Sequence, residues 1–254
     1  MSNFTKLIVN ADDFGLNDSV NHAIIEAFNK SYITNTTLMV NMPGAEDAVR
    51  IAKSHGFWNR VGLHLNLYEG IPMNLNLRNF DFLWNDSRTG LKYWTVGKKR
   101  FILPHDLKRE LLLEMKMQIE KFISYDPICM HLDSHGHSHT NPIIWFLLRD
   151  LVEKYGFESI RLVRNLVKSE KNISYFYRFL CNLDIKRKTK IHSDLFGSFV
   201  DFKNIRDFSD MYKGKVVELM CHPVYDNKGK LCNLNNLSFE DFQKLTNNIE
   251  RIKY

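Results

Sequence analysis

The sequence predicts an α/β fold, a deformed (β/α) barrel of the type found in glycoside hydrolases and deacetylases. Short apolar runs alternate with longer amphipathic segments along the chain, which is the pattern of repeated βα units in a parallel sheet. With 254 residues, of which 44% are hydrophobic, the chain can bury one large core. α/β barrels commonly occupy this length as one domain, so we expect a single catalytic domain over residues 1–254.

Each element follows from its local pattern. Short apolar runs predict strands at 6–10, 36–40, 61–67, 128–132, 159–163 and 216–221. Apolar residues at helical spacing predict helices at 19–29, 45–54, 104–124, 142–155 and 238–252. The segment 165–190 is basic and ambiguous, and we assign it no structure.

Residues 68–103 break the βα rhythm. This segment is rich in Asn, Gly and aromatic residues and is too long for an ordinary βα loop. We predict that it is a lid insertion at the mouth of the site and that its aromatic rings contact a sugar. The alternative for any single ring is that it packs the insertion against the barrel. The rings are Tyr68, Phe80, Phe82, Trp84, Tyr93 and Trp94.

Composition excludes several classes of protein. The net charge of +6 is modest and dispersed, and the basic runs lack the interleaved aromatics of a nucleic-acid groove. The four cysteines form no CxxC pair, which excludes a zinc ribbon and a thioredoxin-like site. No signal peptide or membrane span is evident, so a cytoplasmic protein that binds neither nucleic acid nor membrane is expected.

Ionisable residues stand where four of the predicted strands end: Asp12-Asp13, His64, the segment 131–139, and His222. The carboxyl ends of parallel strands meet at one edge of a sheet, where active sites form. Taken alone, an Asp pair is commonly a helix cap and a strand His is commonly a core residue. The segment 131–139 is harder to explain as packing, because it has an ionisable residue at every second position up to Gly136, which interrupts the alternation.

These residue types predict a metal site with a general base beside it. One carboxylate with two imidazoles gives a three-ligand site whose open positions take water and substrate. A second, adjacent carboxylate can accept a proton from that water.

Five motifs together resemble one family. They are NADDFG at 10–15, TNTTLMV at 34–40, GLH at 62–64, HLDSH at 131–135 and CHP at 221–223. In this combination the chain resembles the YdjC-like carbohydrate deacetylases, typified by the chito-oligosaccharide deacetylase. The resemblance implies a metal-dependent hydrolase that removes an N-acetyl group from an acetylated amino sugar or a short oligosaccharide and releases acetate.

Roles transfer position by position. The resemblance matches Asp13, His64 and His135 to the ligands of one divalent metal ion, usually Mg²⁺ in the family. Ligation rich in imidazole would also suit Zn²⁺, Co²⁺ or Ni²⁺. The resemblance also matches Asp12 to the family's presumed general base, His222 to a candidate general acid, and Arg161 to a basic position near the substrate.

Two points stay open. The family commonly has a bulkier residue, often His, at the position where this chain has Gly136. This difference leaves the predicted ligands intact but alters the pocket wall. Residues 165–215 match least, so the sugar is not predicted.

The alternatives to this function are another metal-dependent hydrolase of the phosphoesterase kind and a non-catalytic carbohydrate-binding relative. The expected partner is a small carbohydrate, and a homodimer is compatible with the sequence.

Overall fold

The computed structural model describes residues 6–83, 103–166, 173–204, 213–234, 237–247 and 249–254. Its strands are β1 (Lys6–Phe14), β2 (Asn35–Leu38), β3 (Val61–Leu65), β4 (His131–Ser134), β5 (Ser159–Ile160), β6 (Leu195–Ser198), β7 (Val216–Cys221), β8 (Pro223–Tyr225), β9 (Leu231–Asn233) and β10 (Glu250–Arg251). Its α-helices are α1 (Asp18–Asn29), α2 (Ala45–Ser54), α3 (His105–Ile123), α4 (Pro142–Lys154), α5 (Ile173–Lys188), α6 (Phe199–Asn204) and α7 (Phe239–Thr246).

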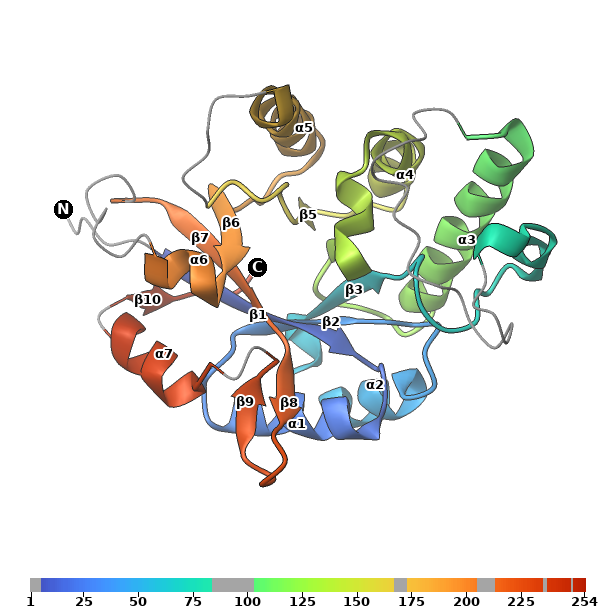
Figure 1. Cartoon of the computed structure of the whole chain (residues 1–254). Coiled ribbons are helices and arrows are strands. Elements are labelled where there is room, and N and C mark those ends of the chain that lie inside the picture. Colours follow the sequence, from blue (N-terminus) through green and yellow to red (C-terminus); the bar gives the residue numbers. More distant parts are fainter. Residues whose placement is uncertain (1–5, 84–102, 167–172, 205–212, 235–236, 248) are drawn as a thin grey trace.

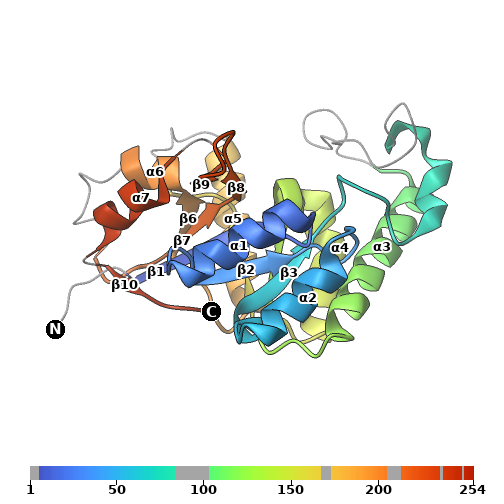
Figure 2. The same ribbon diagram turned by 90° about the horizontal axis from the view of Figure 1, so that it is seen from below.

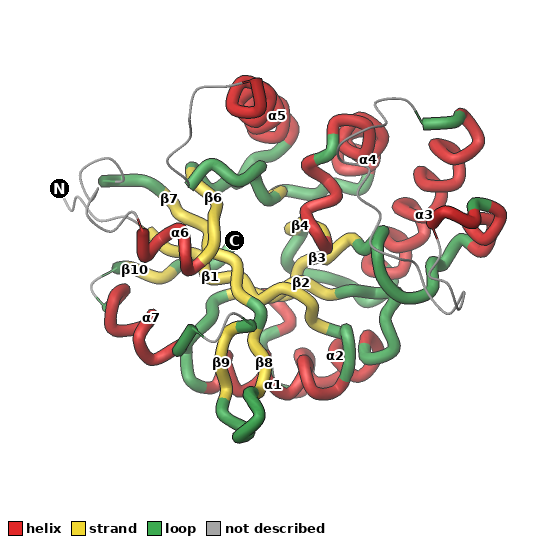
Figure 3. The backbone as a smooth tube through the Cα atoms, in the orientation of Figure 1, coloured by secondary structure: helices red, strands yellow, loops and turns green. Residues whose placement is uncertain are grey.

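The main sheet is parallel and curled, with strand order β5-β4-β3-β2-β1-β7-β6 and with β10 also paired to β1. Helices surround its outer side, as Figures 1 and 2 show. The tube view in Figure 3 shows the hairpin β8–β9 projecting beyond the end of β7. The predicted deformed barrel is therefore confirmed, in the form of a curled half-barrel.

The two edges of this sheet meet through the segment that follows β5. The backbone N–H groups of Asn165 and Leu166 both donate to the carbonyl of Phe196 in β6, at N–O distances of 3.2 and 2.9 Å. In return, the backbone N–H of Phe196 donates to the side chain of Asn165 at 2.7 Å. These bonds bring the two sides of the half-barrel together around its interior.

Local signals explain where the helices begin. The side chain of Asn17 accepts from the N–H of Val20 at the start of α1, and Asn141 caps α4 with Pro142 in the first turn. The predicted helices 19–29, 45–54, 104–124 and 142–155 all agree with the structure to within one residue at each end. A continuous core of buried apolar side chains lies between the sheet and these helices.

The predicted helix 238–252 is wrong in its second half. α7 ends at Thr246, and Glu250–Arg251 form β10 beside the first two residues of β1. The reason is tertiary pairing, since the N–H of Ile252 also donates to the carbonyl of Leu7. The predicted strand 159–163 shortens to the two residues of β5, and the predicted strand 128–132 becomes β4, three residues further along at its start.

No helix in the described ranges is both long enough and apolar enough to span a bilayer.

The closing contact at Asn165 generates a test of the fold. Asn165→Ala removes the acceptor of the Phe196 N–H and the donor to the carbonyl of Asp194, and should lower the free energy of unfolding by about 1–3 kcal/mol. The exposed Asn29 at the end of α1 provides a matched control, since Asn29→Ala should stay within about 0.5 kcal/mol of wild type. Urea unfolding measures both; equal stability of the two variants would contradict this role of Asn165.

Candidate metal and catalytic site

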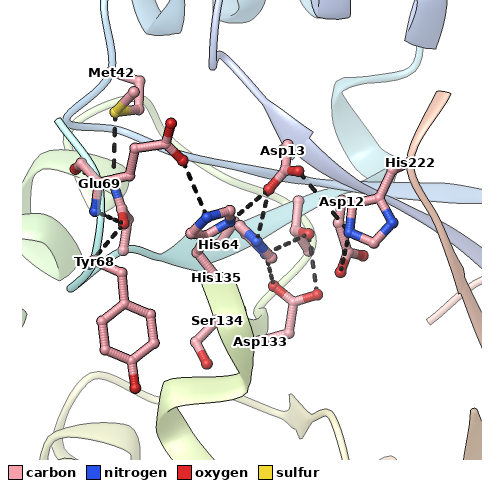
Figure 4. A network of polar contacts seen from close by, with 12 residues as sticks. Asp12, Asp13, Met42, His64, Tyr68, Glu69, Asp133, Ser134, His135 and His222 are labelled. Carbon is pink, nitrogen blue, oxygen red and sulfur yellow. Dashed lines mark hydrogen bonds and ion pairs between the residues drawn. The ribbon is translucent and has the colours of Figure 1, made fainter. Parts of the chain in front are cut away.

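Five predicted site residues lie at one edge of the curled sheet. Asp12 and Asp13 stand near the end of β1, His64 in β3, His135 directly after β4, and His222 directly after β7 (Figure 4). Parallel pairing in register explains part of this gathering. His64, for example, is the direct neighbour of Asp133 across β3 and β4.

The end of β1 is irregular around its two aspartates. The pairing of β1 with β2 shifts register between Ala11 and Phe14, and Asp13 has a left-handed φ of 70°. Aspartate tolerates this conformation better than most residues, and Gly15 continues the turn with a φ of 90°. The two adjacent carboxylates therefore contact different partners.

Asp13 lies between two imidazoles. Its Oδ1 is 2.8 Å from Nδ1 of His135 and 3.2 Å from Nε2 of His64. The ligand atoms of the three residues all lie within 4.8 Å of one another, close enough to bind one metal ion. The structure thus brings together the three residues that the sequence matches to metal ligands.

Each of these imidazoles has a carboxylate at its second nitrogen. Nδ1 of His64 donates to Oδ1 of Asp133 at 2.6 Å, and Asp133 also accepts from the Thr37 hydroxyl. Nε2 of His135 lies 3.1 Å from Oε2 of Glu69. In metal sites, such outer carboxylates set the tautomer and the orientation of a ligating histidine.

Arg161 forms a buried ion network behind the site. Its Nη1 and Nη2 atoms form a bidentate pair with Asp12, both at 2.7 Å. Nη2 also lies 2.8 Å from Asp133, and Nε donates to Glu218 at 2.5 Å. The side chain is fully buried, and its guanidinium lies over the ring of Phe196 at 4.8 Å from the ring centre.

His222 faces both aspartates across a gap. Its Nε2 is 3.9 Å from Oδ2 of Asp12 and 3.9 Å from Oδ2 of Asp13, too far for a hydrogen bond. The N–H of His222 donates to the side chain of Asn233, so the hairpin β8–β9 fixes its backbone. The ring is partly exposed at the site.

Burial and charge shift the pKa values of these groups in opposite directions. Burial alone would raise the pKa of Asp12, but the Arg161 guanidinium, together with His64 and His222, holds it well below the usual range. Burial likewise opposes the hydrogen bonds from His135 and His64, which nevertheless hold the pKa of Asp13 well below its usual range. Burial would lower the pKa of His64, yet Asp133 and Asp13 raise it to about 10. Against the same effect of burial, hydrogen bonds to Asp13 and Glu69 raise the pKa of His135 to about 9.

Two other histidines of the segment 131–139, His131 and His139, make structural contacts. His131, near the start of β4, stacks on Tyr254 with ring centres 3.6 Å apart. His139 bonds to Ser134 and to the backbone carbonyl of Arg161. As expected, Gly136 ends the alternation, since β4 stops at Ser134 and the chain turns with a φ of 58° at Gly136.

The predicted insertion is only partly described, since 84–102 lie outside the described residues, and with them Trp84, Tyr93 and Trp94. The described part is not without structure: it contains the 3₁₀ turns Leu75–Asn79 and Asp81–Leu83. Tyr68 is buried, and Phe80 and Phe82 pack against the core with their ring centres 6.4 Å apart. These three rings therefore pack against the barrel in the structure.

The sequence pattern places Asp133 on the polar face of the segment 131–139 without a role of its own, and it indicates nothing for Glu218 or Glu69. Asp133 carried a signal, because it alternates with His131 and His135 on a predicted strand end. Glu218 sits within an apolar strand, where a carboxylate that is buried needs a cationic partner. Glu69 had no signal of its own in the insertion.

Several curated proteins are similar to this chain. A carbohydrate deacetylase of Geobacillus stearothermophilus is 35% identical over 223 residues, covering 86% of this chain and 79% of that protein. Carbohydrate deacetylases of Brevibacillus brevis and Clostridium beijerinckii are 32% and 29% identical, each covering 87% of this chain and 82% of their own length.

A solved structure supports the fold. A proposed cellobiose-phosphate cleavage protein of Enterococcus faecalis superposes with a TM-score of 0.71 at 20% identity, covering 99% of this chain and 98% of that one. The family model described as YdjC-like protein matches residues 6–251. This match spans nearly the whole sequence, and the resemblance of the motifs is confirmed: the chain belongs to the YdjC-like family.

Proposed function

We propose that this protein is a metal-dependent carbohydrate deacetylase, which hydrolyses the N-acetyl group of an amino sugar or a short oligosaccharide. The proposal rests on one observation. Asp13, His64 and His135 gather around one point as a possible metal site, and the carboxylate of Asp12 lies beside them as a possible base. The carbohydrate deacetylases among its relatives supply the class of substrate.

The residues fit a divalent cation. Two imidazoles and one carboxylate, each imidazole backed by a second carboxylate, form a donor set that suits Zn²⁺ or Co²⁺, whereas Mg²⁺ prefers oxygen ligands. A cation bound there would supply Lewis acidity, lowering the pKa of a water molecule and polarising the acetyl carbonyl.

Asp12 is the proposed general base. Its depressed pKa keeps it ionised throughout the neutral range, so it can accept a proton, although only from a water that has itself been acidified. The oxygen of that water forms a bond to the acetyl carbon, and the C–N bond then breaks. We assign to His222 the protonation of the departing amine, which leaves as the free amino sugar while acetate is released.

For Arg161 we propose a positioning role. Its guanidinium is fully buried and already contacts three carboxylates, those of Asp12, Asp133 and Glu218. A direct contact with substrate, as the sequence resemblance implied, would require it to leave that network. We propose instead that Arg161 fixes the orientation of Asp12 and keeps it ionised.

The same network favours this proposal over a two-metal phosphoesterase. A second metal needs its own cluster of free carboxylates. Three of the further acidic groups near this site, Asp12, Asp133 and Glu218, are ion-paired to Arg161. A fourth, Glu69, contacts His135. A non-catalytic carbohydrate-binding relative would not need Asp12 and His222 beside the three potential ligands.

We further propose that the insertion 68–103 helps to select the sugar. It starts three residues after β3, which contains His64, so its first residues lie at the edge of the sheet where the site forms. Glu69, its second residue, contacts His135 directly.

Acetate release tests the proposed function. A screen over N-acetylated mono- and disaccharides should find a substrate, activity should disappear after chelation, and adding back one of Zn²⁺, Co²⁺ or Mg²⁺ should restore it. Acetate release that persists unchanged after complete chelation would contradict metal dependence.

A second test concerns the ligands. His64→Ala and His135→Ala each remove one of three protein ligands, and should weaken metal binding by more than about 100-fold, beyond the usual effect of outer-shell changes. Elemental analysis after dialysis measures the loss. His105→Ala is the control, because that side chain is 93% exposed at the start of α3. Full metal content in both site variants would rule out this ligand set.

A third test separates base from ligand. Asp12→Asn cannot accept a proton at neutral pH, so turnover should fall by about 10²–10⁴-fold while the metal stays bound. Asp47→Asn, which alters an exposed Asp–Arg pair on α2, is the matched control and should leave turnover unchanged. Near-normal acetate release by a folded Asp12→Asn would remove Asp12 from this role.

A further inference from the structure

Glu69 contacts the outer side of a proposed metal ligand. Its Oε2 lies 3.1 Å from Nε2 of His135, while Nδ1 of the same ring lies 2.8 Å from Oδ1 of Asp13 (Figure 4). The imidazole of His135 is thus held between two carboxylates, one at each nitrogen.

This arrangement repeats the one around His64. Nε2 of His64 faces Asp13 and its Nδ1 donates to Asp133. In both rings one nitrogen points toward Asp13 and the other meets a carboxylate outside the ligand set. A histidine ligand whose second N–H donates to a carboxylate is fixed in tautomer and orientation, and its metal affinity depends on that partner.

The backbone of Glu69 is held in place by a buried side chain. Oδ1 of Asn66 accepts from the N–H groups of Tyr68 and Glu69, both at 3.1 Å, and its Nδ2 donates to the carbonyl of Glu69 at 2.8 Å. Asn66 is fully buried, and Gln118 of α3 bonds to both its N–H and its carbonyl. Glu69 therefore does not depend on a flexible loop to reach His135.

Gly70 completes the turn. It has a left-handed φ of 70°, and a Cβ at this position would lie 2.5 Å from the Sδ of Met42. The left-handed conformation favours glycine, so the turn at Gly70 and the bonds from Asn66 together fix the backbone of Glu69.

We propose that Glu69 is a positioning residue of the metal site: it accepts a hydrogen bond from Nε2–H of His135 and so directs Nδ1 of that ring toward the metal ion. The inference rests on the proposed metal site and adds Glu69 to the residues that orient its ligands. The side chain of Glu69 is 49% exposed, whereas Asp133, which contacts His64, is buried. Of these two carboxylates, Glu69 is therefore the one that solvent and substrate can reach.

Metal affinity tests the inference directly. The dissociation constants for Zn²⁺ and Co²⁺ are measured by competition with a chromophoric chelator for wild type, Glu69→Ala and Glu69→Gln, and the absorption spectrum of bound Co²⁺ reports the geometry. Glu69→Ala should weaken binding by about 10–100-fold. Glu69→Gln should weaken it less, because the amide oxygen still accepts from Nε2–H.

Glu120→Ala is the matched control. Glu120 lies on α3, its side chain is also 49% exposed, and it contacts the Tyr155 hydroxyl at 2.6 Å and Lys116 at 3.7 Å. Its replacement should leave metal affinity and the Co²⁺ spectrum unchanged. Thermal unfolding of the metal-free variants shows whether each one folds.

The possible outcomes separate the two proposals. If wild type binds neither ion, the proposed metal site fails, and this inference fails with it. If wild type binds and folded Glu69→Ala binds equally well, only the positioning role is overturned. Equal losses in Glu69→Gln and Glu69→Ala would also overturn it, because the carboxylate would then act as a ligand or a charge rather than as an acceptor.

Discussion

One buried guanidinium determines the arrangement of the site. Arg161, directly after β5, bonds to Asp12 on β1, Asp133 on β4 and Glu218 on β7, and so joins three strands through the interior of the half-barrel. Removing one partner of such a buried pair typically costs about 3–5 kcal/mol, because a charge is left uncompensated. The orientation of Asp133, and through it that of His64, follows from this network.

The network also sets the charge of the site. Three carboxylates surround one guanidinium, and Asp13 adds a fourth a short distance away. Against the opposing effect of burial, Asp133 and Asp13 raise the pKa of His64, and hydrogen bonds to Asp13 and Glu69 raise the pKa of His135. The negative charge of these carboxylates also favours the binding of a cation between the two imidazoles.

Much of the fold and of the candidate site could be predicted because their signals are local. Alternating apolar runs and helix caps located most of β1–β4 and α1–α4, and parallel pairing implied that residues at strand ends would meet, as Asp13, His64 and His135 do. The pattern did not reveal α5, β6 or β10. β10 consists of two residues that are strand only because β1 lies beside them, which no local pattern contains.

Other parts of the site could not be predicted for the same reason, because their contacts join residues that are far apart in the sequence. Nothing near Arg161 in the sequence indicates that its partners are Asp12, 149 residues earlier, and Glu218, 57 residues later. Asp12 and Asp13 are neighbours in the sequence, yet they have different partners. The register of β1 with β2 shifts between Ala11 and Phe14, and Asp13 has a left-handed φ of 70°. Its carboxylate contacts the imidazoles, while that of Asp12 pairs with the guanidinium. From Ala11 to Phe14, β1 has one residue more than the part of β2 that pairs with it. At this irregularity, the two identical side chains of Asp12 and Asp13 reach different partners and so acquire different chemistry.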